Sequence, residues 1–244
     1  MRAFKVLGLL ALVVLEVGCG LPSPYFLSPP VVPQLAQLTS PNFYFASTTA
    51  NNEIELRGFE VYYKFETDPT SQGFINDTNL GSTTNTYTDL TVAGFSPLCS
   101  STDVSPLTHQ SPLIPIAIGD RGQTFTVTLT ISTNSANKGV STYSYTGPAS
   151  GSVSGEVRRA APLPSNLFTS GCKLFLSNSN VTSYTDYDPT ADNDVRAIFS
   201  TAQSSGGTAY LMMYALTYGL QDISTPIYSN PVYLGYISIN ILTS

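Results

Sequence analysis

Side chains that could do chemistry are few in this chain of 244 residues, and their spacing fits no common catalytic site. The single histidine, His109, lies in the loop-like stretch PLTHQSP. Ser-x-x-Lys spacing occurs at residues 135–138 and 170–173, but neither serine opens a helix, as that catalysis requires. The stretch GSVSG at residues 151–155 has Val153 where a G-x-S-x-G nucleophile elbow has its serine. We therefore assign no catalytic residue and expect a protein that is not an enzyme.

The best candidate for a ligand site is the acidic run DYDPTADND at residues 186–194. Its carboxylates belong to Asp186, Asp188, Asp192 and Asp194. They could supply oxygen ligands to Ca²⁺, which takes about six to eight of them. The run lacks the glycine and the terminal glutamate of an EF-hand loop, and a solvated acidic turn between strands explains it as well. No metal is therefore assigned, and calcium stays a candidate.

The composition favours short strands and turns over helices. Hydrophobic residues make up 42% of the chain and charged residues only 11%, against about 25% in an ordinary soluble domain. Serine, threonine, asparagine, tyrosine and proline take their place, and β-branched and aromatic side chains pack well on a pleated sheet. The apolar content is too high for wholesale disorder, so we expect a substantial core.

The charge balance argues against a nucleic-acid partner. The chain has ten basic and sixteen acidic residues; without residues 1–18, which hold Arg2, Lys5 and Glu16, these numbers fall to eight and fifteen. The nearest thing to a basic patch is the pair Arg158-Arg159. Phosphate neutralisation supplies most nucleic-acid affinity, and electrostatic attachment to anionic lipid needs basic residues too, so neither is expected.

The N-terminus has the pattern of a secretory signal. MRAFK carries two positive charges, and the apolar run VLGLLALVVL follows at residues 6–15. Ten residues are too few for a helix to span a hydrocarbon core of about 30 Å. We therefore expect residues 1–18 to be removed during export.

The residues that follow this run resemble the lipobox of bacterial lipoproteins. Val17-Gly18-Cys19 fits its last three positions, whereas Glu16 stands where an apolar residue is usual. Spirochaete lipoproteins are similar in having relaxed lipoboxes, so the resemblance points to that group. It implies that the Cys19 thiol carries diacylglycerol and becomes the first residue of the mature protein. With Gly20 rather than aspartate next, it also implies a place in the cell envelope at the outer membrane.

Residues 19–41 have the composition of a proline-rich tether. The six prolines between residues 20 and 41 allow neither a helix nor a central strand. The segment also contains Phe26, Leu27, Val31 and Leu38, which are too apolar for a purely solvated linker. Part of it is therefore expected to dock on the domain surface or to insert at the membrane interface.

Period-two alternation of apolar and polar residues marks the strands of residues 42–244. The clearest case is QTFTVTLTIS at 123–132, whose four apolar residues share one face and whose threonines share the other. LIPIAI at 113–118 precedes it, and GDRG between them is a turn signal, so we predict a hairpin with Asp120 at its tip.

Two further strands have distinctive patterns. In IELRGFEVYYKFE, residues 54–66, the apolar phase of Ile54 and Leu56 is opposite to that of the later residues, and a β-bulge at Gly58 would restore one apolar face. TAYLMMYALTYG at 208–219 is apolar on both faces, which predicts a central strand. Additional strands are predicted at 42–48, 172–178, 194–200 and 229–241, and no amphipathic helix longer than two turns.

Two segments together resemble parts of fibronectin type III domains. GFEVYYKF at 58–65 resembles strand C, and residues 210–235 are similar to the F–G hairpin. The resemblance implies an all-β fold, an immunoglobulin-like (fibronectin type III-like) β-sandwich with long insertions. The long stretch between the two segments leaves an alternative, a second small β-region inserted at about residues 95–175.

Cys99 and Cys172 remain once Cys19 is assigned to lipid. In an exported protein two such cysteines most often pair, and closing so long a loop would stabilise the fold by about 4 kcal/mol in the chain-entropy model. Two separate buried thiols are the alternative. A paired couple and one histidine do not make an ordinary zinc site.

Fifteen tyrosines raise the question of a sugar- or protein-binding face. Several lie at strand positions, where tyrosine normally packs with its hydroxyl at the rim. The chain has no tryptophan, the favoured sugar-stacking residue. Packing within the domain is therefore the expected role of Tyr62, Tyr210, Tyr214, Tyr218 and Tyr236.

Together these patterns predict a lipid-anchored envelope protein whose body is a non-enzymatic binding or structural module, either adhesin-like or an envelope scaffold. Its expected partners are the membrane, through lipid, and a protein of the envelope or of a host. The alternatives are a component associated with an outer-membrane β-barrel and, less favoured, a hydrolase.

Overall fold

The computed structural model describes residues 27–32, 38, 40–51, 54–80, 87–100, 111–132, 141–159, 208–221 and 225–240. Their elements, in chain order, are β1 (Asn42–Ala46), β2 (Leu56–Glu66), α2 (Gln72–Thr78), α3 (Tyr87–Val92), β3 (Ser96–Cys99), β4 (Ile114–Pro115), the 3-10 turn η2 (Ile118–Asp120), β5 (Thr126–Thr130), β6 (Ser141–Gly147), β7 (Gly151–Arg159), β8 (Thr208–Gln221), β9 (Thr225–Tyr228) and β10 (Val232–Asn240). The predicted strands at 172–178 and 194–200 lie outside these ranges.

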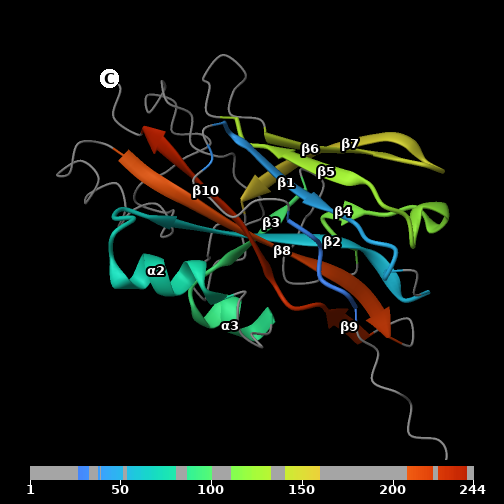
Figure 1. Cartoon of the computed structure of the whole chain (residues 1–244), viewed down its shortest axis with the longest axis horizontal. Helices are drawn as coiled ribbons and strands as arrows, with labels where there is room; N and C mark the ends of the chain where they lie inside the picture. The colour runs from blue at the N-terminus through green and yellow to red at the C-terminus, as the bar shows by residue number, and fades with distance from the viewer. Residues whose placement is uncertain are drawn as a thin grey trace, which may run out of the picture.

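The described strands form one antiparallel sheet that curls into a half-barrel (Figure 1). Its order is β1-β5-β6-β7-β3-β2-β8-β10, with β4 paired to β2 and β9 to β8. The short strand β3 joins the two halves, since it pairs with β7 on one side and with β2 on the other. The all-β prediction is confirmed, and strands β3 to β7, within the range of the suspected insertion, belong to this same sheet.

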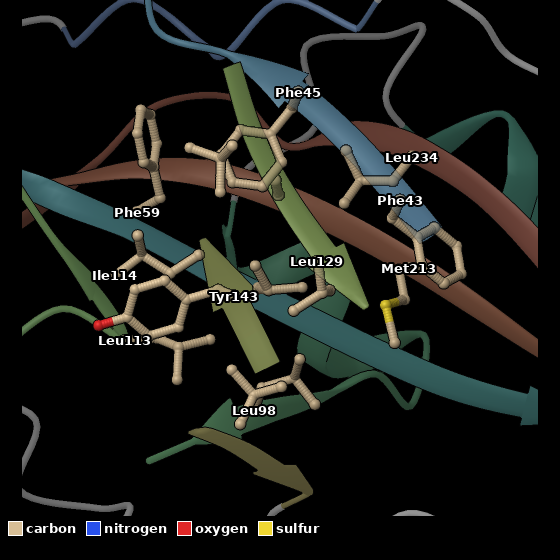
Figure 2. Close-up of a cluster of buried hydrophobic side chains, with 14 of the residues drawn as sticks. Phe43, Phe45, Phe59, Leu98, Leu113, Ile114, Leu129, Tyr143, Met213 and Leu234 are labelled. Carbon is tan, nitrogen blue, oxygen red and sulfur yellow. The ribbon is translucent and has the colours of Figure 1, made fainter. Parts of the chain in front are cut away.

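The main core lies inside the curl, between the β1-β5-β6-β7 half and the β2-β8-β10 half. Figure 2 shows side chains of both halves pointing toward one another, with Phe43 and Phe45 on β1 and Met213 on β8. The rings of Phe45 and Phe59 meet edge to face at 5.0 Å between centroids. Phe43, Phe45 and Phe59 are all 0% exposed, and burial of such side chains contributes about 1.5–3 kcal/mol each.

A second apolar cluster covers the outer face of β2, β8 and β10, beneath α2 and α3 (Figure 1). Phe74 of α2 and Leu90 of α3 are buried in it. Ser71 caps α2, because its side chain accepts a hydrogen bond from the Phe74 amide. Neither helix was predicted individually, but each is at most two turns long, as expected for this chain.

Three strand predictions are confirmed. Along β5 and its flanks Phe125, Val127, Leu129 and Ile131 are buried, while the threonines of β5 face outward. Strand β8 is buried on both faces. The pairing of β2 with β8 shifts register between Leu56 and Gly58, which is the predicted bulge.

The predicted 113–132 hairpin is wrong. Strand β4 pairs with β2, whereas β5 pairs with β1 and β6, so the two strands lie in different parts of the sheet. The GDRG segment forms a 3-10 turn in which Asp120 is fully buried rather than exposed at a tip. Its carboxylate binds the turn between β6 and β7, and this distant contact sets the path of the chain.

The inward phase predicted for Ile54 is also wrong. Strand β2 begins only at Leu56, and Ile54 precedes it in a turn with its side chain 75% exposed.

Part of the predicted tether, residues 19–41, docks on the domain, as predicted. Leu27 is 6% exposed, and Val31 forms a β-bridge with Ala46, so the folded body includes residues 27–32.

Candidate functional site

Most residues predicted from the sequence as site candidates lie outside the described residues. They are Cys19, His109, Cys172, Asp186, Asp188, Asp192 and Asp194. Cys99, the last residue of β3, is fully buried and disulfide-bonded. Its partner lies outside the described residues, so pairing with Cys172 stays a prediction.

Tyrosines pack against the outer face of the sheet in the second cluster, as predicted. Tyr62, Tyr214 and Tyr218 are at most 2% exposed. The rings of Tyr87 and Tyr228 stack at 4.5 Å between centroids, and Tyr62 meets Tyr87 edge to face. These rings fill space between strands and helices and do not form an exposed sugar platform.

A buried carboxylate lies among these rings. Glu60 of β2 is 1% exposed, on the strand face that also carries Tyr62. Burial raises the pKa of Tyr62 far above its ordinary value, and the Glu60 carboxylate raises it further. Tyr62 therefore stays protonated at neutral pH and acts as a packing residue rather than as an acid or base.

An ion pair ties β2 to α2. Lys64 Nζ lies 2.5 Å from Asp77 Oδ2 and 2.9 Å from Glu66 Oε1. Burial alone would lower the pKa of Lys64, but hydrogen bonds to both carboxylates outweigh it and raise the pKa. The Tyr214 hydroxyl donates to the Asp77 carbonyl, so these polar groups hold α2 on the sheet.

A shallow hollow of about 370 Å³ lies over the outer face of β5 and β6. Its lining side chains are hydroxyl-bearing or aromatic and include no charged group: Thr124, Phe125, Thr126, Thr128, Ser144, Tyr145, Thr146 and Ser152. The hollow therefore offers hydrogen-bonding groups without a charged side chain, and it is a candidate binding surface.

A set of buried hydrogen bonds holds residues 27–32, where the chain enters the folded body. We call these residues the entry segment. The Asn51 side chain accepts from the Ser28 amide at 2.9 Å and donates to the Ser28 carbonyl at 2.8 Å. Thr217 Oγ1 donates to the same carbonyl at 2.7 Å. Asn51 and Thr217 are both fully buried, so this amide clamp closes on the main chain in a dry setting.

Loss of the amide clamp should loosen the entry segment. Asn51→Ala removes two buried hydrogen bonds, and we expect a loss of about 2 kcal/mol of stability and faster proteolytic cleavage between residues 27 and 32. Urea unfolding and limited proteolysis measure these effects. Ser28→Ala is the matched control, because Ser28 uses only main-chain atoms in the clamp and should behave as the wild type. Equal cleavage of the Asn51→Ala variant and the wild type would contradict the role given to the clamp.

Asp120 forms the second buried polar site. Its Oδ1 accepts from the amides of Ala149 at 2.6 Å and Ser150 at 3.3 Å. Burial by itself would raise the pKa of Asp120, but the hydrogen bonds from Ser150 and from the Ala149 amide outweigh it and hold the pKa below its ordinary value. The charged form thus fixes the β6–β7 turn against η2.

Within the described ranges, no three His, Cys, Asp or Glu side chains gather closely enough to hold a metal ion. The same residues include no helix with the length and apolar character needed to cross a membrane. No protein-family model matches the sequence, and no curated protein or solved structure matches it either.

Sequence reasoning missed both the amide clamp and the Asp120 cap. A buried asparagine between strands carries no pattern that distinguishes it from a turn residue. The GDRG motif locates Asp120, but nothing in its composition indicates that the partners of Asp120 lie about thirty residues further along the chain. The described polar sites accordingly serve to join segments, and none of them has the arrangement of a catalytic centre.

Proposed function

We propose that the chain is a bacterial lipoprotein held at the outer membrane through lipid on Cys19, and that its body is a non-enzymatic binding or structural module. The observation that carries this proposal is the N-terminal sequence, in which a basic start, ten apolar residues and Val17-Gly18-Cys19 follow in order. Several acyl chains on one cysteine would hold the protein on a bilayer stably.

The non-enzymatic part of the proposal is supported by the described polar side chains, which bind other parts of the chain. Asn51 and Asp120 bind main-chain atoms of other segments, and Lys64 links β2 to α2. The uncharged hollow over β5 and β6 suits a binding role, adhesin-like or scaffold-like.

Substitution of the anchor cysteine tests the proposal. The full chain, expressed in a bacterium with an outer membrane, should yield a mature N-terminus that begins at Cys19 and carries the mass of added acyl chains. Cys19→Ala should retain the signal and lose the acyl mass; because the retained apolar run at residues 6–15 also favours the detergent phase, the acyl mass is the deciding readout. Intact-mass spectrometry provides the measurement.

Glu16→Leu is the matched control, because it restores the usual apolar residue and should be processed at least as well as the wild type. An unmodified Cys19 in the wild-type protein, or equal acyl mass in the Cys19→Ala variant, would overturn the proposal. Proteinase treatment of intact cells then separates the two roles, since a surface adhesin is digested and a periplasmic scaffold is protected.

The finer fold assignment, an immunoglobulin-like sandwich with long insertions, belongs to the same proposal. Its support is the order β2-β8-β10, which pairs the segment resembling strand C directly with the hairpin resembling F–G. An experimental structure in which the two halves of the sheet face each other about 10 Å apart with nearly aligned strands would bear it out. Halves that cross at near right angles would speak against it.

A further inference from the structure

Several loops meet at the end of the molecule where the chain enters the folded body. Leu27 packs beside Gly219, where an added Cβ would lie 2.9 Å from Leu27 Cδ1 and 2.7 Å from the Glu55 carbonyl oxygen. Asn51 holds Ser28 through its side chain and accepts a hydrogen bond from the Gly122 amide through its carbonyl, at 2.8 Å. The entry segment, the start of β2 and the η2 turn are therefore one connected surface, at the right-hand end of Figure 1.

Two isoleucines stand out from this surface. Ile54 is 75% exposed and Ile118 is 78% exposed, although both have large branched apolar side chains. Arg121 joins their two loops, because its guanidinium donates to the Ile54 carbonyl at 2.7 Å and its amide binds the Ile118 carbonyl. Arg57 donates to the same Ile54 carbonyl, also at 2.7 Å.

This surface therefore presents two apolar tips beside two cations, with one carboxylate, Glu55, close by. We call Ile54, Arg57, Ile118 and Arg121 the entry-end patch. Apolar side chains flanked by arginines suit the boundary between lipid headgroups and acyl chains, where isoleucine leaves water and guanidinium meets phosphate. The chain as a whole is acidic, with a net charge of −6.

The length of chain before Leu27 brings this patch close to the proposed anchor. Leu27 follows Cys19 by eight positions, and a fully extended chain of that length reaches at most about 29 Å. Lipid on Cys19 would thus keep the entry end within that distance of the bilayer. The opposite end of the sheet has no such constraint.

We propose that the entry-end patch rests on the membrane surface, with Ile54 and Ile118 inserted among the lipid headgroups. The inference rests on the proposed lipid anchor and adds the orientation of the body: the entry end lies on the bilayer, and α2, which packs on Tyr210 at the other end of β8, lies away from it. The body is then a membrane-seated module and not one held at a distance on a free tether.

Single-tryptophan variants test this orientation, because the chain has no tryptophan of its own. Ile54→Trp and Ile118→Trp report on the patch, and Val92→Trp on α3 is the matched control, since Val92 is 82% exposed. Each lipidated full-length variant is placed in phosphatidylcholine vesicles with or without brominated acyl chains. We expect emission at shorter wavelength and at least about twofold quenching for the two patch variants only.

Each outcome is decisive. If the variants float with vesicles but the patch variants are quenched no more than Val92→Trp, the proposed membrane contact of the patch is wrong. The proposed lipid anchor is unaffected by that result. If the full chain does not float with vesicles, both the proposed lipid anchor and the proposed orientation are wrong. An emission shift that follows protein concentration in detergent, without lipid, assigns the patch to a second copy of the chain and also overturns the proposal. Circular dichroism confirms that each variant folds, which the exposure of all three positions leads us to expect.

Discussion

Replacing Gly58 with alanine is expected to destabilise the protein by about 3 kcal/mol, the upper end of the usual cost of overpacking and a large part of the total stability of an ordinary domain. An added Cβ at this position would lie 2.1 Å from the Ile114 carbonyl oxygen and 2.8 Å from the Pro112 side chain. The first of these atoms belongs to the main chain of the β2–β4 pairing and cannot rotate away. The Ile114 strand must therefore move off β2 and open the main core.

Urea unfolding measures this loss as a lower midpoint with an unchanged slope. Gly73→Ala is the control: Gly73 lies exposed in α2, its nearest neighbour to an added Cβ is Ser71 Oγ at 3.9 Å, and alanine favours helix. It should raise the stability by up to about 1 kcal/mol. If Gly58→Ala unfolds within about 0.5 kcal/mol of the wild type, the bulge does not hold β4 in place as described.

Gly58 also illustrates what the sequence could predict. The apolar residues at Leu56 and Phe59 would lie on opposite faces of a regular strand, because side chains alternate between faces with a period of two. One extra residue, a β-bulge, is the simplest way to bring both onto the same buried face. The same kind of argument located β5 by alternation and β8 by its two apolar faces. Patterns within one segment were therefore sufficient for individual strands.

Contacts between distant segments could not be predicted in this way. The hairpin prediction failed because GDRG has the composition of a tight turn, while the partners of β4 and Asp120 lie elsewhere in the chain. The amide clamp escaped notice because Ser28 takes part only through its main chain, which any residue could supply. Ile54 fitted an alternating pattern, yet the strand begins two residues later. The predictions for Cys19, Cys172 and the acidic run depend on residues outside the described ranges.

Replacing Asp120 is expected to have the second large effect, and one that depends on pH. Asp120→Ala removes the acceptor for two amide hydrogen bonds and leaves a void beneath the β6–β7 turn, at an expected cost of about 3 kcal/mol near pH 7. Asp120→Asn keeps the shape and one acceptor oxygen but removes the charge, so its cost should be smaller, about 1–2 kcal/mol. Chemical unfolding of both variants provides the measurement.

The pH dependence has a definite sign. The pKa of Asp120 is lowered in the folded protein, because hydrogen bonds to Ser150 and Ala149 outweigh the effect of burial. Its contribution is therefore complete above the unfolded-state pKa of about 3.9 and is lost as the pH falls through the lower folded-state value. The stability difference between the wild type and Asp120→Asn should be constant from about pH 5 to 7 and shrink toward pH 3.

Asp68→Asn is the matched control for this experiment. Asp68 also accepts two hydrogen bonds, from the amide and hydroxyl of Thr70, and its pKa is also lowered by them, but it lies exposed at the surface. Solvent screens such a group, so its substitution should change stability and acid sensitivity far less. Equal acid sensitivity of the two variants would show that burial of Asp120 adds nothing. A change in stability and acid sensitivity confined to Asp120→Asn would instead show that acid weakens the entry end through the buried hydrogen bonds between η2 and the β6–β7 turn.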